Sequence, residues 1–292
     1  MNNLRLKPGT PVLVIGAPSG NALRHMRLMR DYGTNIIACV TFSEGGTGID
    51  GIASFTNCAD AISATGAKVA VTLASPDTTG HAVLEAAEAG VSLIISPTIL
   101  VPIHDTLRVR RRVRDLGTVW IGPGGTGLAI PGNSINLGVT PNEILRPGNI
   151  GVIAMPSTLS LEVGFAMANH HLGQSMWIGV GVDLMKGARP SDFVPFFAQD
   201  EETTTVVLIC GRGGTDEEEF AEAVGHFGFS KPVLALLAGE NAAATNSSFS
   251  RFLESRQLSH FVKIRTALEQ AGVAVYDGID DLIGAIPTSL PQ

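Results

Sequence analysis

The chain has 292 residues, of which 45% are apolar, 5% aromatic and 16% charged, and 34 of them are glycine. Its formal net charge of −7 argues against a general nucleic-acid-binding protein, which would carry a basic surface. Its three cysteines show neither zinc-ligand spacing nor a disulfide framework, so we expect no metal bound by this chain and a reducing, cytoplasmic location.

The length suits about two domains. The amino-terminal segment runs directly into a strand pattern typical of soluble proteins, so we expect no secretory signal. The longest uncharged stretch, residues 116–142, is interrupted repeatedly by glycine and proline, so we expect no membrane-spanning helix.

Strand and helix patterns alternate through the first half of the chain. The first unit is a strand at 11–15, a glycine-containing turn and a helix at 21–32. The patterns that follow predict strands at 36–40, 68–73, 91–95 and 118–121, and helices at 81–89 and 103–116. Such alternation predicts a parallel, doubly wound sheet with right-handed crossovers.

The pattern changes between residues 122 and 147, where glycine, proline and asparagine become dense and periodicity is lost. We interpret this stretch as a small hairpin and a linker. The chain is therefore predicted to divide into two domains, residues 1–147 and residues 148–292.

The second half repeats the alternation. Its patterns predict strands at 150–153, 176–180, 205–209, 232–237 and 273–276, and helices starting near 157 and at 192–198, 216–226, 249–257, 259–271 and 279–285. A second parallel sheet is expected from this order.

The stretch from residue 149 to residue 173 carries the clearest candidate site. A buried strand breaks at Met155-Pro156 and restarts as a helix, which Ser157 or Thr158 can cap with a side-chain oxygen. The remaining first-turn N–H groups and the positive end of the helix dipole suit a phosphate or carboxylate. An ordinary strand-to-helix corner without a ligand is the alternative.

Two further turns follow predicted parallel strands, at whose carboxyl ends open α/β sheets bind ligands. Gly16 and Gly20 bracket the first turn and would let the backbone contact phosphate, and Ser75-Pro76 follows the third strand. The first turn is not GxGxxG, and no acidic residue clearly ends the second strand, so the sequence argues against an NAD site.

Other polar groups have simpler explanations. Five arginines crowd the helix at 103–116 and spread over more than one face, which is typical of a solvated helix. The seven histidines show no metal-ligand spacing. The run Glu217–Glu219 opens a helix, where acidic side chains complement the helix dipole.

Short motifs run through almost the whole chain in a definite order. They include Tyr32-Gly-Thr, Gly45-Gly-Thr47, Trp120-Ile-Gly-Pro123, Arg146-Pro-Gly-Asn-Ile-Gly151, Ser157-Thr-Leu-Ser-Leu-Glu162, Gly179-Val-Gly-Val-Asp183, Gly213-Gly-Thr-Asp-Glu-Glu-Glu219 and Lys231-Pro232. In order and spacing the chain resembles the α subunits of succinyl-CoA synthetase and related nucleoside-diphosphate-forming acyl-CoA ligases.

The resemblance implies an α/β fold, in which a Rossmann-like CoA-binding domain precedes a flavodoxin-like ligase domain and both contain parallel sheets. It implies a partner subunit of the β type with an ATP-grasp nucleotide site, and CoA or acyl-CoA as a bound group. In the family, a histidine of the α chain relays phosphoryl between nucleotide and acid. The helix that starts near residue 157 resembles the family's "power helix", whose N-terminus holds this phosphohistidine.

Candidate residues follow from the turns and from the resemblance together. We expect a CoA or phosphate group at Pro18, Ser19, Gly20, Asn21, Ser75 and Pro76. We expect a small carboxylate or other anion at Ser157, Thr158 and Ser160. We expect neither nucleic acid nor a membrane as a partner.

The chain departs from the family where the chemistry lies. Residues 240–257, which should carry the phosphorylated histidine, contain no histidine, and Gly211 stands where the family has the glutamate that supports it. Without this nucleophile the two-step phosphoryl relay has no intermediate to form. On the CoA side, the family's lysine, glutamate and asparagine are Glu44, Ile99 and Gly124 here.

Three functions remain open on the sequence. The first is a divergent α-type subunit that binds a small carboxylate or acyl group and works only with a β-type partner. The second is an FdrA-type subunit of an acyl or carbamoyl transferase complex. The third is a non-catalytic binding or scaffolding subunit.

Overall fold

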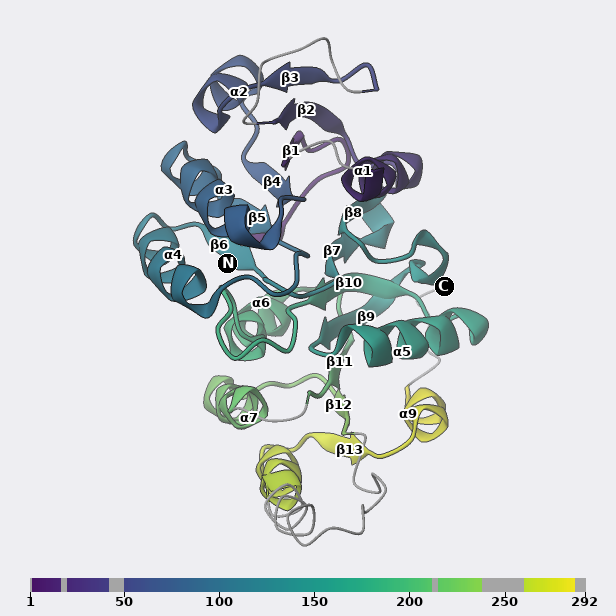
Figure 1. Ribbon diagram of the computed structural model, residues 1–292. Coiled ribbons are helices and arrows are strands. Elements are labelled where there is room, and N and C mark those ends of the chain that lie inside the picture. Colours follow the sequence, from purple (N-terminus) through teal and green to yellow (C-terminus); the bar gives the residue numbers. More distant parts are fainter. Residues whose placement is uncertain (1, 17–19, 42–49, 212–214, 238–259, 287–292) are drawn as a thin grey trace, which may run out of the picture.

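The computed structural model describes residues 2–16, 20–41, 50–211, 215–237 and 260–286. Within these ranges the chain forms two α/β sheets that lie one beyond the other along the long direction of the molecule (Figure 1). The predicted fold class, two successive α/β units with parallel strands, is confirmed.

The first sheet is parallel, and its strand order is β3-β2-β1-β4-β5-β6. Its strands are β1 (Val12–Ile15), β2 (Ile36–Val40), β3 (Ala53–Phe55), β4 (Val69–Thr72), β5 (Leu93–Ile95) and β6 (Val119–Ile121). Its helices are α1 (Gly20–Tyr32), α2 (Cys58–Thr65), α3 (Pro76–Glu88) and α4 (Ile103–Asp115). Strands β1, β4 and β5 are buried at every position, as expected for a sheet that is covered on both faces.

The helices divide between the two faces of this sheet. Met26 and Met29 of α1 join the core on one face, while α2, α3 and α4 cover the other face with small and β-branched side chains. Strand β3 and helix α2 were not predicted, because both are short and lack a long apolar pattern. Asn57 caps α2 by accepting a hydrogen bond from the Asp60 N–H at 2.8 Å.

The second sheet has the order β13-β12-β11-β9-β10-β7-β8. Its parallel strands are β9 (Pro147–Ala154), β10 (Gln174–Gly179), β11 (Thr205–Ile209), β12 (Val233–Leu236) and β13 (Ala274–Tyr276), and its antiparallel hairpin is β7 (Gly127–Ile130) with β8 (Ile135–Gly138). The predicted hairpin is therefore confirmed, but it pairs with β10 and makes this sheet mixed. The boundary after residue 147 stays a prediction: β9 begins at Pro147, and the hairpin before it belongs to the second sheet.

Helices cover both faces of the second sheet as well. Helices α5 (Ser157–Asn169) and α9 (Ile279–Ala285) pack on one face, and α6 (Val194–Gln199), α7 (Asp216–Phe227) and the helical residues 260–270 pack on the other. The predicted helix at 192–198 is a 3-10 turn (Pro190–Phe193) that leads into α6. The other short 3-10 turns are Asn2–Leu4, Pro131–Asn133 and Asn142–Ile144. The helix predicted at 249–257 lies outside the described residues.

The two sheets share one hydrophobic core, because α1 of the first unit packs against the β7–β8 hairpin of the second. Two hydrogen bonds close this contact: the Thr34 hydroxyl donates to the Asn136 carbonyl at 2.9 Å, and the Asn136 N–H donates to the Thr34 hydroxyl at 3.0 Å. This packing fixes the orientation of the two strand arrays, and with it the relative position of their carboxyl ends.

Candidate functional site

The strand order predicts a ligand crevice in each sheet. The order of the first sheet reverses between β1 and β4, and that of the second sheet reverses between β9 and β11. At such a switch point the loops after neighbouring strands turn toward opposite faces and leave a crevice at the carboxyl ends of the strands. The candidate residues in the described ranges fall at these two places, at the starts of α1, α3 and α5.

Gly16 brings the two turns of the first crevice together. Its φ is +137°, and a Cβ on it would lie 2.7 Å from the backbone nitrogen of Ala74 and 2.7 Å from the carbonyl carbon of Leu73. Only glycine permits this conformation and this approach. The structure therefore packs the residue after β1 against the loop after β4, while Pro18 and Ser19 lie outside the described residues.

The two helix starts at this crevice differ in charge. Ser75 makes no side-chain cap bond to α3, and its hydrogen bond to the Asp77 carboxyl holds the pKa of Asp77 below its usual range. The first turn of α3 therefore already carries a negative charge. The first turn of α1 contains no acidic residue, and both Gly20 and Asn21 are exposed there. On this electrostatic argument a phosphate would be better placed at α1 than at Ser75 and Pro76.

The start of α5 differs from the prediction, because neither Ser157 nor Thr158 caps the helix. Pro156 occupies the cap position, so the helix has no side-chain cap bond. The Ser157 hydroxyl instead donates to the Gly124 carbonyl at 3.4 Å, and the buried Ser160 hydroxyl donates to the Ser157 carbonyl at 2.7 Å. A capping side chain must come from the non-helical residue before the helix, and proline has no polar group to offer.

The missing cap leaves α5 suited to an anion. Its first turn contains no acidic residue, and the cap residue gives its N–H groups no side-chain acceptor. Thr158 is exposed, whereas the Ser160 side chain points into the protein and already has a partner. The group that α5 offers a ligand is therefore its uncapped first turn rather than the three hydroxyls together.

Glu217 bonds to Gly211, which contacts Met155 just before α5, and its role was not recognised from the sequence. It is 1% exposed, and its Oε1 accepts a hydrogen bond from the Gly211 N–H at 3.0 Å. Its Oε2 has no hydrogen-bond partner among the described residues. Burial, more than the nearby Asp216 charge, raises the pKa of the Glu217 carboxyl to about 7. Dipole complementarity alone therefore does not explain this residue of the Glu217–Glu219 run.

A buried ion pair fixes the loop that follows β10. Lys186 is 1% exposed, and its ammonium donates to the Gly181 carbonyl at 2.8 Å and to the Asp216 carboxylate at 2.6 Å. In the same loop, the Asp183 carboxylate lies against Gly124, where a Cβ would be 2.9 Å from its Oδ2. Burial raises the pKa of Asp183, and the Lys186 charge opposes that shift.

Hydrogen bonds connect the two crevices. The Thr98 hydroxyl donates to the Ala74 carbonyl at 3.0 Å, and the Gly124 N–H donates to the Thr98 carbonyl at 2.9 Å. The Ser157 hydroxyl then reaches the Gly124 carbonyl at 3.4 Å. The path from the first crevice to the start of α5 therefore runs through only two residues, Thr98 and Gly124.

The arginines of α4 follow the prediction in part. Arg108, Arg111, Arg112 and Arg114 are exposed, as a solvated helix requires. Arg110 is half-buried, and burial, with the neighbouring arginine charges, lowers its pKa.

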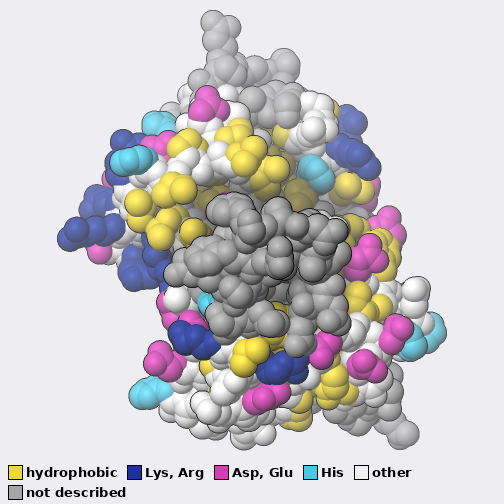
Figure 2. Space-filling view, turned by 60° about the horizontal axis from the view of Figure 1, so that its bottom comes forward, with side chains coloured by type: hydrophobic (Ala, Val, Ile, Leu, Met, Phe, Trp, Pro, Cys, Tyr) yellow, Lys and Arg dark blue, Asp and Glu magenta, His cyan; other side chains and the backbone are white. Residues whose placement is uncertain are grey.

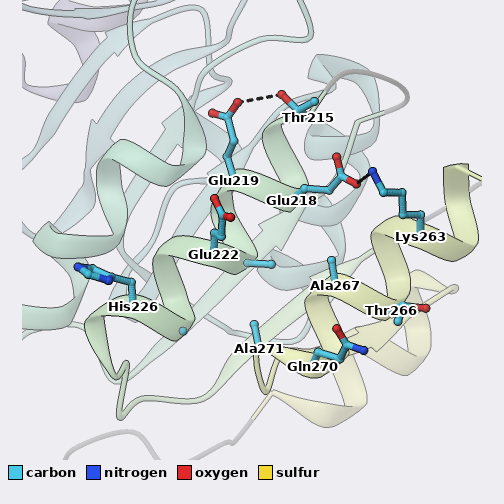
Figure 3. Close-up of a pocket in the computed structure, with 12 residues that line it drawn as sticks. Thr215, Glu218, Glu219, Glu222, His226, Lys263, Thr266, Ala267, Gln270 and Ala271 are labelled. Atoms are coloured by element: carbon cyan, nitrogen blue, oxygen red, sulfur yellow. Dashed lines mark hydrogen bonds and ion pairs between the residues drawn. The ribbon is translucent and has the colours of Figure 1, made fainter.

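A further hollow lies beside α7. It is a groove of about 980 Å³ between α7 and the helical residues 260–270 (Figure 3). Within it Lys263 pairs with Glu218 at 2.6 Å, and the Thr215 hydroxyl donates to Glu219 at 2.8 Å. Charged groups of this groove are thus already paired within it, and we do not take it as the ligand site.

In the described part of the chain, no three His, Cys, Asp or Glu side chains gather in a way that could hold a metal ion. Cys39, Cys58 and Cys210 are free thiols and buried. Among the described helices, none combines the length and apolar character that crossing a membrane requires.

Comparison with known families agrees with the two crevices. Residues 8–99 match the family described as "CoA binding domain", and residues 147–288 match the "Succinyl-CoA ligase like flavodoxin domain". The fold and these two matches together therefore define a protein of the CoA-ligase type. The first crevice lies in the first match, and the start of α5 lies in the second.

Curated relatives refine this assignment. The chain is 35% identical over 233 residues to the succinate–CoA ligase [ADP-forming] subunit alpha 2 of Archaeoglobus fulgidus, which covers 80% of each chain. It is 36% identical over 237 residues to the malate–CoA ligase subunit alpha of Methylorubrum extorquens, covering 80% of this chain and 79% of that one. The chain belongs to the family of succinate–CoA ligase α subunits.

Solved structures show the same fold at lower identity. A dinucleotide-forming acetyl-coenzyme A synthetase 1 from Ca. Korarchaeum cryptofilum matches with a TM-score of 0.76 and 18% identity, covering 97% of this chain and 61% of that one. ATP citrate lyase from Methanothrix soehngenii matches with a TM-score of 0.79 and 18% identity, covering 97% and 50%. This chain thus spans about half to three fifths of those longer chains.

Proposed function

We propose that this chain is the α-type subunit of a succinyl-CoA-synthetase-like acyl-CoA ligase complex, in which it binds a small carboxylate or acyl group without a phosphohistidine relay of its own. One observation carries the proposal: the uncapped, acid-free first turn of α5 lies at the switch point between β9 and β11. Its N–H groups and dipole would hold the anionic end of the ligand.

CoA or acyl-CoA is the proposed ligand of the first crevice. The family match over residues 8–99 and the exposed, acid-free start of α1 at Gly20 and Asn21 support it. Pro18 and Ser19 complete the same turn in the sequence. An acyl or thiol end that leaves this crevice would reach α5 past Thr98 and Gly124, which are already joined by a 2.9 Å hydrogen bond.

The residues of this chain would bind and orient the reactants, and they would leave activation of the acid to the partner. Residues 240–257 offer no imidazole, and Gly211 offers no side chain, so the chain lacks the family's phosphoryl acceptor. A nucleotide-binding, β-type ATP-grasp subunit would therefore have to present the activated acyl group at the start of α5.

Exposed apolar side chains at the same edge of the molecule support such a partner. Ile99 and Leu100 in the loop after β5 are 62% and 80% exposed, and Val182 and Leu184 in the loop after β10 are 54% and 65% exposed. One face of the molecule shows hydrophobic side chains gathered beside lysine and arginine (Figure 2). Clustered exposed apolar surface of this kind often marks a protein interface.

The carboxylate site can be tested by a charge and its neutral isostere at exposed Thr158. We expect Thr158→Asp to weaken succinate binding about tenfold or more, because its carboxylate would occupy the first turn of α5. Thr158→Asn should change the affinity less than about threefold. Equal effects of the two substitutions in isothermal titration calorimetry would contradict an anion site at α5.

A CoA titration tests the other half of the proposal, and we expect saturable heat from the full chain. A flat trace at millimolar CoA, with and without the partner, would remove the ligase function in its usual form. Incubation with labelled ATP or GTP should leave no acid-labile phosphate on this chain. Phosphohistidine on the purified chain would refute the proposal that this chain lacks a phosphohistidine relay.

The absent histidine also favours the second candidate, an FdrA-type subunit of an acyl or carbamoyl transferase complex. A purified complex that transfers carbamoyl or acyl groups but forms no thioester from CoA, acid and nucleotide would favour it. A scaffolding subunit would bind its partner and neither small ligand. The cytoplasmic location stays a prediction.

A further inference from the structure

The carboxyl group of Glu217 is buried with half of its hydrogen-bonding capacity unused. Oε1 accepts from the Gly211 N–H at 3.0 Å, while Oε2 is inaccessible and has no partner among the described residues. Buried polar oxygens in native proteins nearly always have a partner, so an unused one in a crevice indicates a ligand or a proton that completes the site.

The carboxyl group lies at the switch point of the second sheet. The position that a Cβ on Gly211 would take is 3.8 Å from Glu217 Oε1, 3.6 Å from Met155 Cβ and 3.7 Å from Val182 Cγ1. These are ordinary van der Waals distances, so space for a methyl-sized group exists between the three loops. Met155 stands two residues before α5, so Gly211, whose N–H donates to the Glu217 carboxyl, contacts the segment that leads into that helix.

The charged groups around Glu217 favour its neutral form. From its own helix, Asp216 adds a negative charge, and Cys210 at the end of β11 contributes a buried thiol whose pKa is raised. From the loop after β10, Lys186 is the nearby cation, but its ammonium is already bound to Asp216 and to a carbonyl. The first turn of α5 contributes no acidic side chain. A pKa of about 7 makes the neutral acid well populated near neutral pH.

We propose that neutral Glu217 is a ligand-binding residue of the α5 site, which donates a hydrogen bond from its free oxygen to an oxygen of the bound carboxylate. The inference rests on the proposed function, because α5 supplies the rest of the site. The helix holds the anion from one side, and the carboxylic acid holds it from the other. Ionised Glu217 repels the same anion, so binding of the acid substrate requires the proton.

The Glu217→Gln variant separates this role from the bulk pH dependence of the ligand. Glutamine keeps a donor at all pH values and has nearly the same shape. With the complete chain, succinate affinity of the natural protein should fall about tenfold between pH 6 and pH 8, because the neutral fraction of a group with a pKa of about 7 falls by that factor. The affinity of Glu217→Gln should stay within about twofold of the natural protein's value at pH 6.

Glu218→Gln is the matched control, because Glu218 is the next residue of α7 but faces the outer groove and pairs there with Lys263 (Figure 3). The affinity of Glu218→Gln for succinate should fall about tenfold between pH 6 and pH 8, as in the natural protein. Sulfate serves as a second probe, because its charge is constant over this range and its binding should show the same fall. A carboxylic-acid band in the infrared difference spectrum that titrates near pH 7 and is absent from Glu217→Gln provides a readout independent of affinity.

The outcomes separate the two proposals. If succinate and sulfate bind with constant affinity from pH 6 to pH 8, or if Glu217→Gln keeps the fall, this role of Glu217 is refuted and the α5 site stands. If neither probe binds to the natural protein or to Glu218→Gln at any pH, the α5 site itself is refuted, and the role of Glu217 with it.

Discussion

The ion pair between Lys186 and Asp216 offers a direct measure of how strongly the site loop is held. Lys186 Nζ lies 2.6 Å from Asp216 Oδ2, and the two side chains are 0% and 14% exposed. We expect the Lys186→Met substitution, which keeps the length and the apolar stem of the side chain, to destabilise the second unit. Methionine removes the cation and leaves Asp216 with an unneutralised, largely buried charge.

The size of the effect follows from burial. Removing one partner of a buried pair costs about 3–5 kcal/mol, because the other charge stays desolvated. Asp216 retains some solvent contact, and Arg189 Nε lies 3.9 Å away, so we expect the lower end, about 3 kcal/mol. Asp216→Asn should cost a similar amount. The double variant should cost about 2 kcal/mol less than the sum of the two single variants, because it leaves neither charge alone.

The matched control is Lys263→Met. Lys263 Nζ also lies 2.6 Å from a carboxylate oxygen, that of Glu218, but the lysine side chain is 70% exposed. An exposed pair contributes at most about 1 kcal/mol, so this variant should barely change stability. The two lysines thus share the distance to their partner and differ in burial.

Urea unfolding followed by tryptophan fluorescence and circular dichroism measures these differences. Trp177 is fully buried in β10, directly before the loop, and reports on the second sheet. The reasoning is refuted if Lys186→Met lowers the free energy of unfolding no more than Lys263→Met does. It is equally refuted if the effects of the two single substitutions at the pair simply add in the double variant.

Gly164→Ala in α5 should destabilise the protein although alanine has the better helix propensity, because a Cβ there would lie 2.6 Å from Ile144 Cδ1. Gly225→Ala in α7 should stabilise the protein by about 0.5–1 kcal/mol, because a Cβ there meets nothing within 4 Å. Thermal melts of the two variants test this difference. The pKa of Glu217 is about 7 in the folded protein, against an ordinary value of 4.5. Between pH 4.5 and pH 7 the folded state therefore keeps a proton that the unfolded state has released, so the free energy of unfolding falls as the pH rises through this range. Glu217→Gln should remove this pH dependence, and at pH 8 its free energy of unfolding in urea should exceed that of the natural protein by on the order of 2–3 kcal/mol. A variant less stable than the natural protein at pH 8 would contradict this prediction. The three buried thiols have raised pKa values, so a thiol reagent should label them slowly in the native protein and rapidly in denaturant; fast native labelling would show that these thiols are reachable.

The strands of the two sheets could be predicted because each is a short apolar run that parallel sheets bury on both faces. Such runs need no long-range information, and the predicted strands at 36–40 and 205–209 coincide with β2 and β11. Chain order alone could not reveal that the hairpin of residues 127–138 pairs with β10, because that pairing joins residues about fifty positions apart in the chain, such as Ala129 and Trp177. Its glycine-rich composition indicated a turn, and packing made it part of a sheet.

The site was predictable only as positions along the chain. The sequence placed Gly20, Ser75 and Ser157 after strands, and parallel pairing brings the carboxyl ends of strands to one edge. The sequence also predicted a serine or threonine cap on α5, but Pro156 holds that place and the first turn is left open. The cap depends on which residue is the first non-helical one, a boundary that local pattern does not fix to within a residue.

The sequence by itself determined the alternation of strands and helices and the order of the family's motifs, and it predicts the loss of the histidine and glutamate of the phosphoryl relay. These are properties of composition and local order, which need no knowledge of neighbours in space. Only the tertiary structure decided that Glu217, within an unremarkable acidic run, is buried against Gly211 and close to Met155. The burial of a carboxyl group and its hydrogen-bond partners depend on segments that are distant in the chain, and together they set its pKa. Local sequence therefore does not determine its charge.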